Sequence, residues 1–465
     1  MYTQSRATQI SALALGIVTA MAFGQADATG FQIRENSVKN LGRANSGLAV
    51  GHNDASVVSN NPAAMTNLDK TTIQADVTMI DLTAEFSGGG TTAAGTPLVG
   101  GDGGDPGDAT AVPALAVVVP LHGDLDRITL GASISAPFGL KTEYDADWIG
   151  RYNAIESDVK IVDLTLSAAL DVTDRFSVGL GVIYERSDVT LSNGIDFGTI
   201  MASTGIPGAL PQGADGTVSV SGDDTGFGWL VGLQWRPTDA LTIGYSHRSE
   251  IDHDLEGDAD FTTPASFAGA QALYRALAAN PALPAAQRAQ LAGLGNGFVD
   301  SAVMAPLTTP SVDTLSVQYD FSDRFRMMAD VQATDWHSLQ AVTIDFENPY
   351  QATAVEAFNW EDTMFYALGG EFDLNDNFTL RAGVAMDESP TNDEARTPRL
   401  PDNDRMLYSI GATWNVSEAL SFDAAYTRIH IDSPSVDVLS SSGSRLTGDF
   451  KGHADLFGVA AQYRF

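Results

Sequence analysis

Most of the chain alternates between apolar residues and small or polar residues with a period of two. From Phe457 to Phe465 every odd position is apolar, and the same alternation runs from Thr72 to Met79 and from Thr314 to Phe321. Successive side chains of a strand point to opposite faces, so this pattern predicts β-strands with one apolar face. A soluble β-sandwich would alternate in the same way, and the connections must therefore distinguish the two environments.

The predicted strands are joined alternately by short turns and long connections. The short turns are His122–Asp126, Val172–Asp174, Arg236–Asp239, Ser322–Asp323, Asn375–Asn377 and Val416–Glu418. The long connections, rich in Gly, Asp and Pro, lie around residues 87–110, 139–154, 192–224, 253–310, 347–360, 388–403 and 431–452. Outer-membrane barrels have an even number of strands, short periplasmic turns and long external loops. We therefore predict an all-β fold, a 14-stranded antiparallel transmembrane β-barrel.

Two segments need a choice of interpretation. Residues Ala341 to Phe346 could form a fifteenth strand, and we interpret them as the outer extension of the strand that begins at Arg324. The Ala-rich stretches Gln271–Leu277 and Ala285–Leu294 predict short helices over the barrel mouth, because so long a loop usually contains structure of its own.

The first 28 residues have the features of a secretory signal peptide. Arg6 precedes an apolar run from Ile10 to Phe23, and small residues flank Asp27 at a cleavage site. No later stretch approaches the roughly 20 apolar residues that a membrane helix requires. A soluble exported protein is the alternative, but the last strand, ending on Phe465, resembles the C-terminal strand of bacterial outer-membrane barrels. It predicts an outer-membrane location and recognition by the barrel assembly machinery.

The charge of the chain bears on its partners. Fifty-nine acids and 25 bases give a formal net charge of -34, and no basic patch is visible. We therefore expect no nucleic-acid partner, because binding to phosphates needs clustered bases. We expect a monomer in contact with membrane lipid and lipopolysaccharide, and the sequence leaves open whether the acidic loops bind divalent cations.

Residues 29–70 lack strand alternation and precede the barrel, which we assign to residues 71–465. A fourteen-stranded barrel is wide enough to hold a plug, whereas side chains alone fill an eight-stranded one. We therefore expect residues 29–70 to form an N-terminal hatch inside the lumen.

Several short motifs then resemble one family. They are Gly30-Phe31-Gln32, Leu41–Gly47, Asp54-Ala55-Ser56, Asn60–Ala63, Ser135–Leu140, Trp148–Tyr152, Tyr245–Glu250, Asp387–Pro390 and Leu400–Arg405. In this order they are similar to segments of the FadL-type outer-membrane transporters of long-chain fatty acids and other hydrophobic molecules. The resemblance covers essentially the whole mature chain.

The resemblance implies a passive mechanism in which ligand enters a pocket in the barrel, the hatch shifts, and the ligand leaves sideways through a kink in the third strand. The corresponding gating residues are Asn61, Pro62 and Ala63 in the hatch, and Pro137, Phe138 and Gly139 at the end of that strand. Proline removes a ladder donor and glycine weakens pairing, so a local opening is physically reasonable there. The alternative is that Pro137 merely ends a strand.

A fatty acid would need a cation or hydrogen-bond donors in the lumen for its head group. The arginines in the polar phase of their strands are Arg248, Arg326, Arg381 and Arg405. An outward arginine at mid-membrane costs roughly 2–4 kcal/mol, which favours inward placement. With Phe31, these four are the candidate ligand-binding residues. The alternative fate of each arginine is an internal ion pair with Asp330, Glu250, Asp404 or an acid of the hatch.

The sequence contains only weak matches to motifs for metal, phosphate or catalytic sites. Asp252 to Gly257 begins like a calcium loop, but Thr263 stands where the glutamate is required, which favours a solvated acidic loop. Gly100 to Gly107 lacks the Lys-Ser/Thr of a phosphate loop, and the seven His have no zinc spacing. We therefore expect no metal, no cofactor and no enzyme activity. The alternatives to fatty-acid transport are an importer of uncharged hydrocarbons, a barrel lipase or protease, and an open porin, against which the hatch argues.

Overall fold

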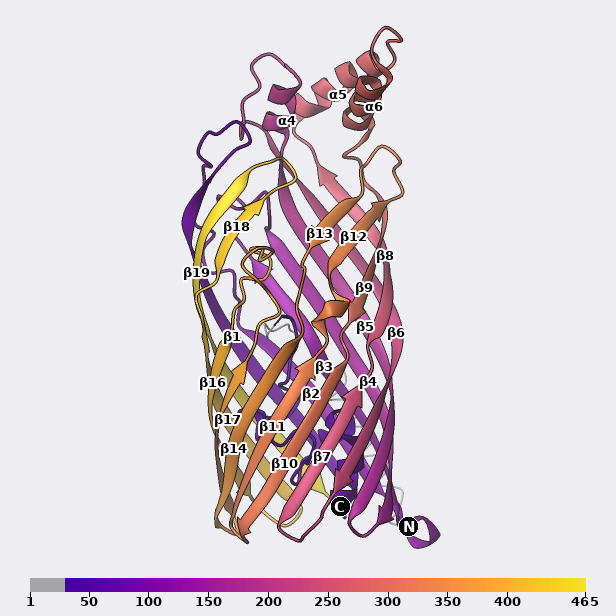
Figure 1. Ribbon diagram of the computed structural model, residues 1–465, viewed down its shortest axis with the longest axis vertical. Coiled ribbons are helices and arrows are strands. Elements are labelled where there is room, and N and C mark those ends of the chain that lie inside the picture. Colours follow the sequence, from indigo (N-terminus) through magenta and orange to yellow (C-terminus); the bar gives the residue numbers. More distant parts are fainter. Residues whose placement is uncertain (1–29) are drawn as a thin grey trace, which may run out of the picture.

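The computed structural model describes residues 30–465, so the predicted signal peptide lies outside the described residues. This part of the chain is a closed antiparallel barrel (Figure 1). Nineteen strand segments make fourteen barrel strands, because five strands are each divided into two consecutive segments. The undivided strands are β1 (Thr72–Thr91), β2 (Thr110–Pro120), β3 (Ile128–Glu143), β4 (Glu156–Thr173), β5 (Phe176–Asp196), β6 (Asp215–Trp235), β15 (Phe378–Asp387), β16 (Arg405–Asn415) and β19 (Arg445–Arg464). The divided strands are β7 (Leu241–Arg248) with β8 (Ile251–Thr262), β9 (Ser301–Thr309) with β10 (Val312–Ser322), β11 (Phe325–Thr334) with β12 (Ala341–Phe346), β13 (Ala354–Ala357) with β14 (Thr363–Asn375), and β17 (Leu420–Ile431) with β18 (Ser435–Leu439).

The first and last strands close the barrel. β1 pairs with β19 along its whole length, from Thr72 opposite Arg464 to Thr91 opposite Arg445. The six predicted turns all lie at one end and the seven long connections at the other, which we call the periplasmic and the extracellular end. The predicted fourteen-stranded fold is confirmed.

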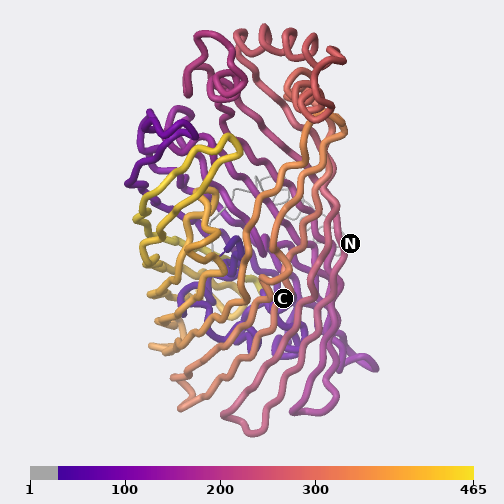
Figure 2. The backbone as a smooth tube through the Cα atoms, turned by 45° about the horizontal axis from the view of Figure 1, so that its top comes forward, coloured from indigo at the N-terminus to yellow at the C-terminus, as the bar shows by residue number. Residues whose placement is uncertain are grey.

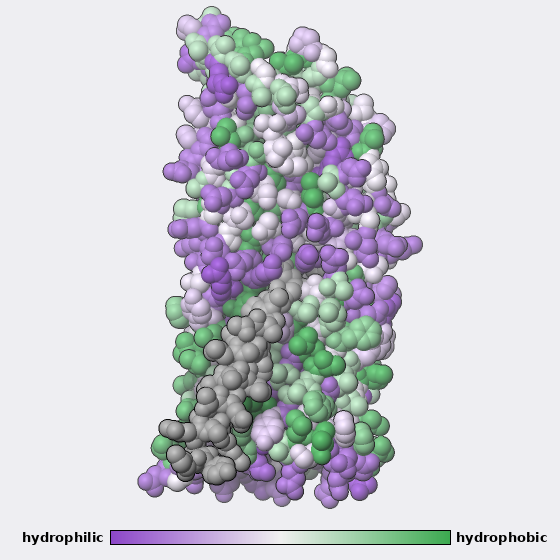
Figure 3. All heavy atoms as spheres, turned by 180° about the vertical axis from the view of Figure 1, so that it is seen from behind, coloured by the Kyte–Doolittle hydropathy of each residue, from purple (hydrophilic) through white to green (hydrophobic). Residues whose placement is uncertain are grey.

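On the face seen in Figure 3, the outer surface is mostly apolar in the periplasmic half and mostly polar in the extracellular half. Outward-facing residues such as Leu180 and Ile410 are exposed and lie on the apolar half. Exposed aromatic residues follow the periplasmic rim, among them Trp235, Phe378 and Trp414. An apolar band bordered by aromatic residues is the surface that a bilayer requires of a barrel.

The strands extend further beyond the apolar half than the sequence predicted. β8 and β9 run through the segment expected to be a loop over residues 253–310, and the acidic stretch beginning at Asp252 is therefore strand and not loop. In β8, His253 and Leu255 are buried while Asp252 and Asp254 are exposed. The outer face is polar here, so the alternation lacks the apolar outer residues that mark a membrane strand.

The predicted helices and the choice of strand number are confirmed. The extracellular connections contain α4 (Phe197–Ser203), α5 (Ala265–Ala278) and α6 (Ala285–Asn296), which stand above the barrel in Figure 1. β12 continues β11 after the short helix η3 (Trp336–Ser338), because β11 pairs with β10 and β12 with β9, the two halves of one neighbouring strand. None of the helices in residues 30–465 is long and apolar enough to cross a bilayer.

Residues 30–70 lie within the ring of strands (Figure 2). They contain α2 (Val38–Leu41), α3 (Val57–Asn60) and η1 (Pro62–Asn67). α2 contacts β16, β17 and β19, whereas η1 contacts β4, β5 and β6, so the segment reaches across the barrel. Ser37 caps α2 by accepting from Asn40 N, and most side chains of the segment are buried. We call residues 30–70 the N-terminal segment.

Candidate functional site: the interior of the barrel

The wall is irregular in β3. Ser135 lies opposite Asp163 of β4 and Phe138 lies opposite Ile161, so two residues of β3 face one residue of β4. This is a β-bulge, which bends its strand. Pro137 thus lies within β3 and does not end it, as the strand continues to Glu143. The pairing of β3 with β2 stops at Ile134, directly before the bulge.

Beyond the bulge, the N-terminal segment forms backbone hydrogen bonds with the edge of β3. Ile33 N donates to Pro137 O and Gly139 N donates to Phe31 O, both at 2.7 Å. Gln32 forms an isolated antiparallel bridge with Phe138. The edge of β3 therefore bends away from β2 and toward the lumen, and its backbone groups are satisfied by residues that precede the barrel.

An aromatic cluster lies at this junction. The ring of Phe31 is 5.8 Å from that of Phe138, 5.0 Å from Trp336 and 5.6 Å from Trp360, measured between centroids. All four side chains are buried. The arrangement brings two predicted site residues, Phe31 and Phe138, into direct contact.

One part of the interior of the extracellular half is apolar. The aromatic cluster is continuous with inward-facing aliphatic residues of β3, β4, β8, β9 and β12. They are Leu140, Val159, Ile161, Leu255, Ala259, Val303, Ala305, Leu307, Val342 and Ile344. This lining contrasts with the periplasmic half, where polar and charged side chains surround the N-terminal segment.

A connection crosses the lumen above the aromatic cluster. Residues 388–404, which we call the crossing loop, join β15 to β16 but contact strands on the other side of the barrel. Thr142 Oγ1 of β3 donates to Arg399 O at 2.9 Å. The buried guanidinium of Arg399 donates to the carbonyl oxygens of Glu156 and Ser192, at 3.1 and 3.3 Å. The crossing loop is thus fastened to β3, β4 and β5.

The Asn61-Pro62-Ala63 motif is fixed against the wall. Asn61 Nδ2 donates to Ala49 O at 2.6 Å and to Leu233 O of β6 at 3.1 Å, and Asn61 Oδ1 accepts from Ala63 N. Asn61 caps η1, and Pro62 occupies the first position, where its missing N–H costs nothing. The motif joins the N-terminal segment to the barrel wall by side-chain and backbone contacts together.

Two of the predicted arginines lie near the aromatic cluster. Arg248 forms ion pairs with Asp163 and Glu185, both at 2.5 Å, and its guanidinium is 5.6 Å from the ring centroid of Phe138. Arg405 pairs with Asp402 of the crossing loop at 2.5 Å. The other carboxylate oxygen of Asp402 accepts from Gly30 N at 3.0 Å. Arg405 is thereby linked to the start of the N-terminal segment.

The other two predicted arginines lie in the periplasmic half. Arg381 pairs with Glu371 at 2.8 Å and with Asp423 at 3.3 Å, and Arg326 pairs with Glu371 at 3.1 Å and with Asp373 at 2.7 Å. All four arginines thus form internal ion pairs. The partners differ from those expected, since Asp330, Glu250 and Asp404 form none of these pairs. Asp330 instead accepts from Gly47 N and Leu48 N.

Other buried cations were not predicted. Arg34 pairs with Asp387 at 2.7 Å and lies over the ring of Phe365 at 4.3 Å, and Arg43 pairs with Glu371 at 2.5 Å. Both precede the first strand, so strand phase could not place them. The available signal was the presence of bases in a segment already expected inside the lumen.

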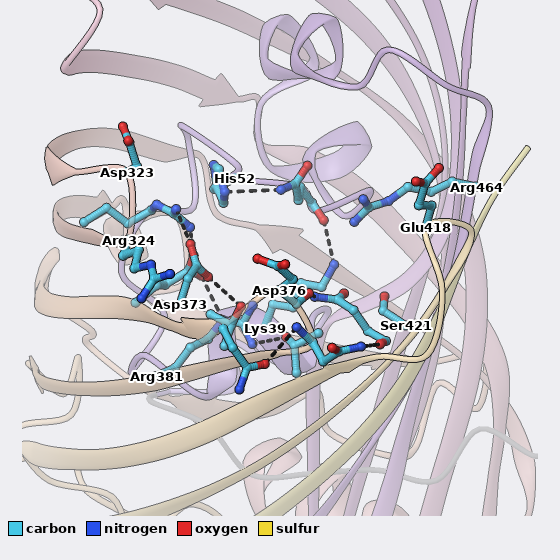
Figure 4. Close-up of a pocket in the computed structure, with 18 of the residues that line it drawn as sticks. Lys39, His52, Asp323, Arg324, Asp373, Asp376, Arg381, Glu418, Ser421 and Arg464 are labelled. Carbon is cyan, nitrogen blue, oxygen red and sulfur yellow. Dashed lines mark hydrogen bonds and ion pairs between the residues drawn. The ribbon is translucent and has the colours of Figure 1, made fainter.

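The periplasmic end contains an open cavity of about 840 Å³ (Figure 4). Its lining comes from the N-terminal segment, including Lys39 and His52, and from the periplasmic ends of strands, including Arg381 and Arg464. Charged and polar side chains dominate the lining. This cavity suits water and ions, and the apolar lining of β3, β4, β8, β9 and β12 suits hydrophobic molecules.

Among residues 30–465, no group of three or more His, Asp or Glu is placed to hold a metal ion. The stretch from Asp252 to Gly257, which begins like a calcium loop, lies in β8, whose alternating side chains point to opposite faces.

Comparison with known proteins identifies the family. Residues 19–465 match the model of the outer membrane transport proteins OMPP1, FadL and TodX. The long-chain fatty acid transport protein of Escherichia coli is 26% identical over 99% of this chain and 100% of its own length. The crystal structure of a FadL homologue from Pseudomonas aeruginosa, 28% identical, superposes with a TM-score of 0.83 and covers 94% of this chain and 100% of its own. The toluene transporter TbuX of Ralstonia pickettii shares the fold at 18% identity and a TM-score of 0.61, covering 92% of this chain and 97% of its own.

These matches span nearly the whole chain and agree with a barrel that carries an apolar outer band. The protein is a transporter and not an enzyme. The chain belongs to the OMPP1/FadL/TodX family of transport proteins for hydrophobic compounds in the outer membrane.

Proposed function

We propose that this transporter takes up long-chain fatty acids by passive diffusion, with the N-terminal segment as a hatch and a lateral exit through β3. The observation that carries the proposal is the bulge at Ala136 and Pro137, where pairing with β2 stops and Phe31 to Ile33 of the N-terminal segment take over the edge. Movement of the N-terminal segment would remove this cover. The wall between β2 and β3 would then be open toward the bilayer.

The apolar interior supports a hydrophobic ligand. Burying about ten methylenes contributes on the order of 8 kcal/mol, at roughly 0.8 kcal/mol each, so an apolar lining alone binds such a chain tightly. Release is the harder step, and a shift of Phe31 away from Phe138 would divide the aromatic lining. No external energy source is required, because the ligand moves from one apolar environment to another.

The head-group residues follow from position. Arg248 lies 5.6 Å from the ring centroid of Phe138, and Arg405 is linked through Asp402 to Gly30, which precedes Phe31; these are the arginines that we propose for a carboxylate. Asn61, Pro62 and Ala63 are the proposed hinge of the hatch, and Pro137, Phe138 and Gly139 the proposed exit. Arg326 and Arg381 line the periplasmic cavity and would meet a carboxylate only there.

A second candidate is the import of uncharged hydrocarbons. The observation in its favour is that Arg248 and Arg405 already have carboxylate partners, so a fatty acid must compete with Asp163, Glu185 or Asp402. A hydrocarbon needs no such exchange. The same interior lining would serve either ligand.

Equilibrium binding to the purified barrel distinguishes the two. We expect a fluorescent fatty acid to bind and to be displaced by palmitate at least tenfold better than by hexadecane or an alkylbenzene. Displacement by the hydrocarbons at equal or lower concentration would support the second candidate. Mass spectrometry of co-purified molecules gives an independent identification. A monomeric state, contact with lipopolysaccharide and recognition through Phe465 stay predictions.

A further inference from the structure

Two cations in the periplasmic cavity share one neutral acceptor. Lys39 lies on α2 and Arg464 lies on β19, and both line the cavity shown in Figure 4. Lys39 Nζ donates to Gln462 Oε1 at 3.0 Å, and Arg464 donates to the same oxygen from Nε at 3.1 Å and from Nη2 at 2.7 Å. The amide oxygen thus brings two positive groups side by side.

Neither cation has a carboxylate partner among the described residues. No carboxylate oxygen in residues 30–465 lies within 4.0 Å of Lys39 Nζ or of the Arg464 guanidinium. The second acceptor of Lys39 is again neutral, Asn53 O at 2.6 Å. This is unusual in a chain of net charge -34, in which Arg326, Arg381 and most other buried cations are paired with acids.

The nearby acids are engaged elsewhere. Asp54 accepts from Ser37 Oγ at 2.5 Å and from Ser56 N at 3.0 Å, and Asp423 pairs with Arg381. Glu371 and Asp373 line the same cavity. Glu371 forms ion pairs with Arg326 and Arg381, and Asp373 forms one with Arg326. The cavity lining also contains Asp69, Asp323, Asp376 and Glu418, and the charge of Asp69 acts on Arg464 without lying within ion-pair distance of it.

The burial of Lys39 makes its charge expensive. Its side chain is 2% exposed, and burial lowers the pKa of the ammonium from its ordinary value. Two like charges that share one acceptor repel each other, and removing a charge from water costs free energy unless an opposite charge compensates it. Both side chains retain N–H donors beyond those bonded to Gln462 and Asn53.

We propose that Lys39 and Arg464 form a binding site for a small oxyanion, a carboxylate or a phosphate, that enters from the periplasm. The anion bridges the two cations and fastens α2 of the N-terminal segment to β19 of the wall. The site is separate from the apolar interior and does not depend on which hydrophobic ligand the barrel carries. Its effect is to stabilise the N-terminal segment in the position seen here.

The test measures binding of trifluoroacetate to the purified full chain in a nonionic detergent at constant ionic strength. The readout is the ¹⁹F NMR signal of trifluoroacetate. We expect a saturable broadening of the signal above that of empty micelles. Arg464→Gln and Lys39→Gln should reduce the apparent affinity at least tenfold. Lys70→Gln removes a cation that lines the same cavity but makes no bond to Gln462, and it should leave the affinity unchanged.

Competition identifies the anion. Displacement of trifluoroacetate by acetate supports a carboxylate site, and displacement by phosphate at lower concentration supports a phosphate site. Displacement by chloride as effectively as by either oxyanion would overturn the proposal. Wild-type broadening in Arg464→Gln would do the same, and this variant decides the question if Lys39→Gln fails to fold, because Arg464 lies near the open end of the barrel.

Discussion

Gly179 of β5 and Gly232 of β6 lie directly opposite each other in the wall, and the Asn61-Pro62-Ala63 motif packs on this pair. A Cβ at position 232 would collide with Asn61 Oδ1, and one at position 179 would collide with Ala63 N. The two glycines therefore permit the close approach of the N-terminal segment to the barrel wall. This contact is where a change in the wall should act on the proposed hatch.

Gly232→Ala should displace η1 from the wall. Overpacking of this kind costs about 1–3 kcal/mol, and here it would destabilise the contact between the N-terminal segment and the barrel wall by that amount. Hydrogen exchange of the backbone in residues 57–67 should become faster, while exchange in β5 and β6 changes little. The matched control is Gly89→Ala, because a Cβ at Gly89 meets no atom within 4 Å. Equal exchange rates of residues 57–67 in both variants would contradict a role of Gly232 in the docking of the N-terminal segment.

Asn61→Ala should weaken the same contact between the N-terminal segment and the wall, here through the loss of hydrogen bonds. It removes the donors to Ala49 O and Leu233 O, and a buried carbonyl left without a donor costs about 1–3 kcal/mol. Proteolysis within the N-terminal segment should become faster. Asn60→Ala is the control, because the Asn60 amide bonds only to side chains of the segment itself. Slow cleavage in both variants would argue against a hinge at Asn61.

Arg399→Gln should open the extracellular side. The guanidinium fastens the crossing loop to Glu156 and Ser192, and the shorter side chain cannot reach both carbonyl oxygens. We expect a fatty acid to associate several-fold faster in stopped-flow binding, with a smaller change in equilibrium affinity. Arg445→Gln breaks an exposed ion pair with Asp437 at the same end and should not change the rate. An unchanged rate in Arg399→Gln would mean that the crossing loop does not limit entry.

Arg405→Ala tests the head-group assignment. If Arg405 contacts a carboxylate, the variant should weaken binding of a fatty acid more than binding of an uncharged hydrocarbon, by about tenfold or more. The double variant Asp402→Ala with Arg405→Ala controls for the carboxylate that the single change leaves buried and unpaired. Equal losses for both ligands would exclude Arg405 from this role and direct attention to Arg248.

The barrel could be predicted from the sequence because the bilayer imposes a local rule. Residues from Thr72 to Met79 alternate since one face meets lipid and the other meets the lumen. The rule weakens in β8, where Asp252 and Asp254 face solvent, so the sequence predicts a loop where the structure has a strand. The alternation with a period of two likewise does not predict the bulge at Ala136 and Pro137. Pro137 indicates only that the strand is irregular at this position.

The interior contacts could not be predicted in this way. Gly30 and Asp402 are 372 residues apart in the chain, and Arg34 and Asp387 are 353 apart. Strand phase shows that a side chain points inward but not which partner it meets there. The partners of Arg248, Arg326, Arg381 and Arg405 depend on the position of the N-terminal segment and on the stagger of neighbouring strands, and neither follows from one sequence.

The most direct test of the central claim is the deletion of Pro137. In β3, Ser135 and Phe138 both face inward, so removing one of the two residues between them restores regular alternation and allows pairing with β2 to continue. We predict that the deletion variant still binds a long-chain fatty acid but no longer supports its uptake by cells that lack another transporter. Pro137→Ala, which keeps the extra residue, should retain uptake. Uptake at the wild-type rate by a folded deletion variant would contradict a lateral exit through β3.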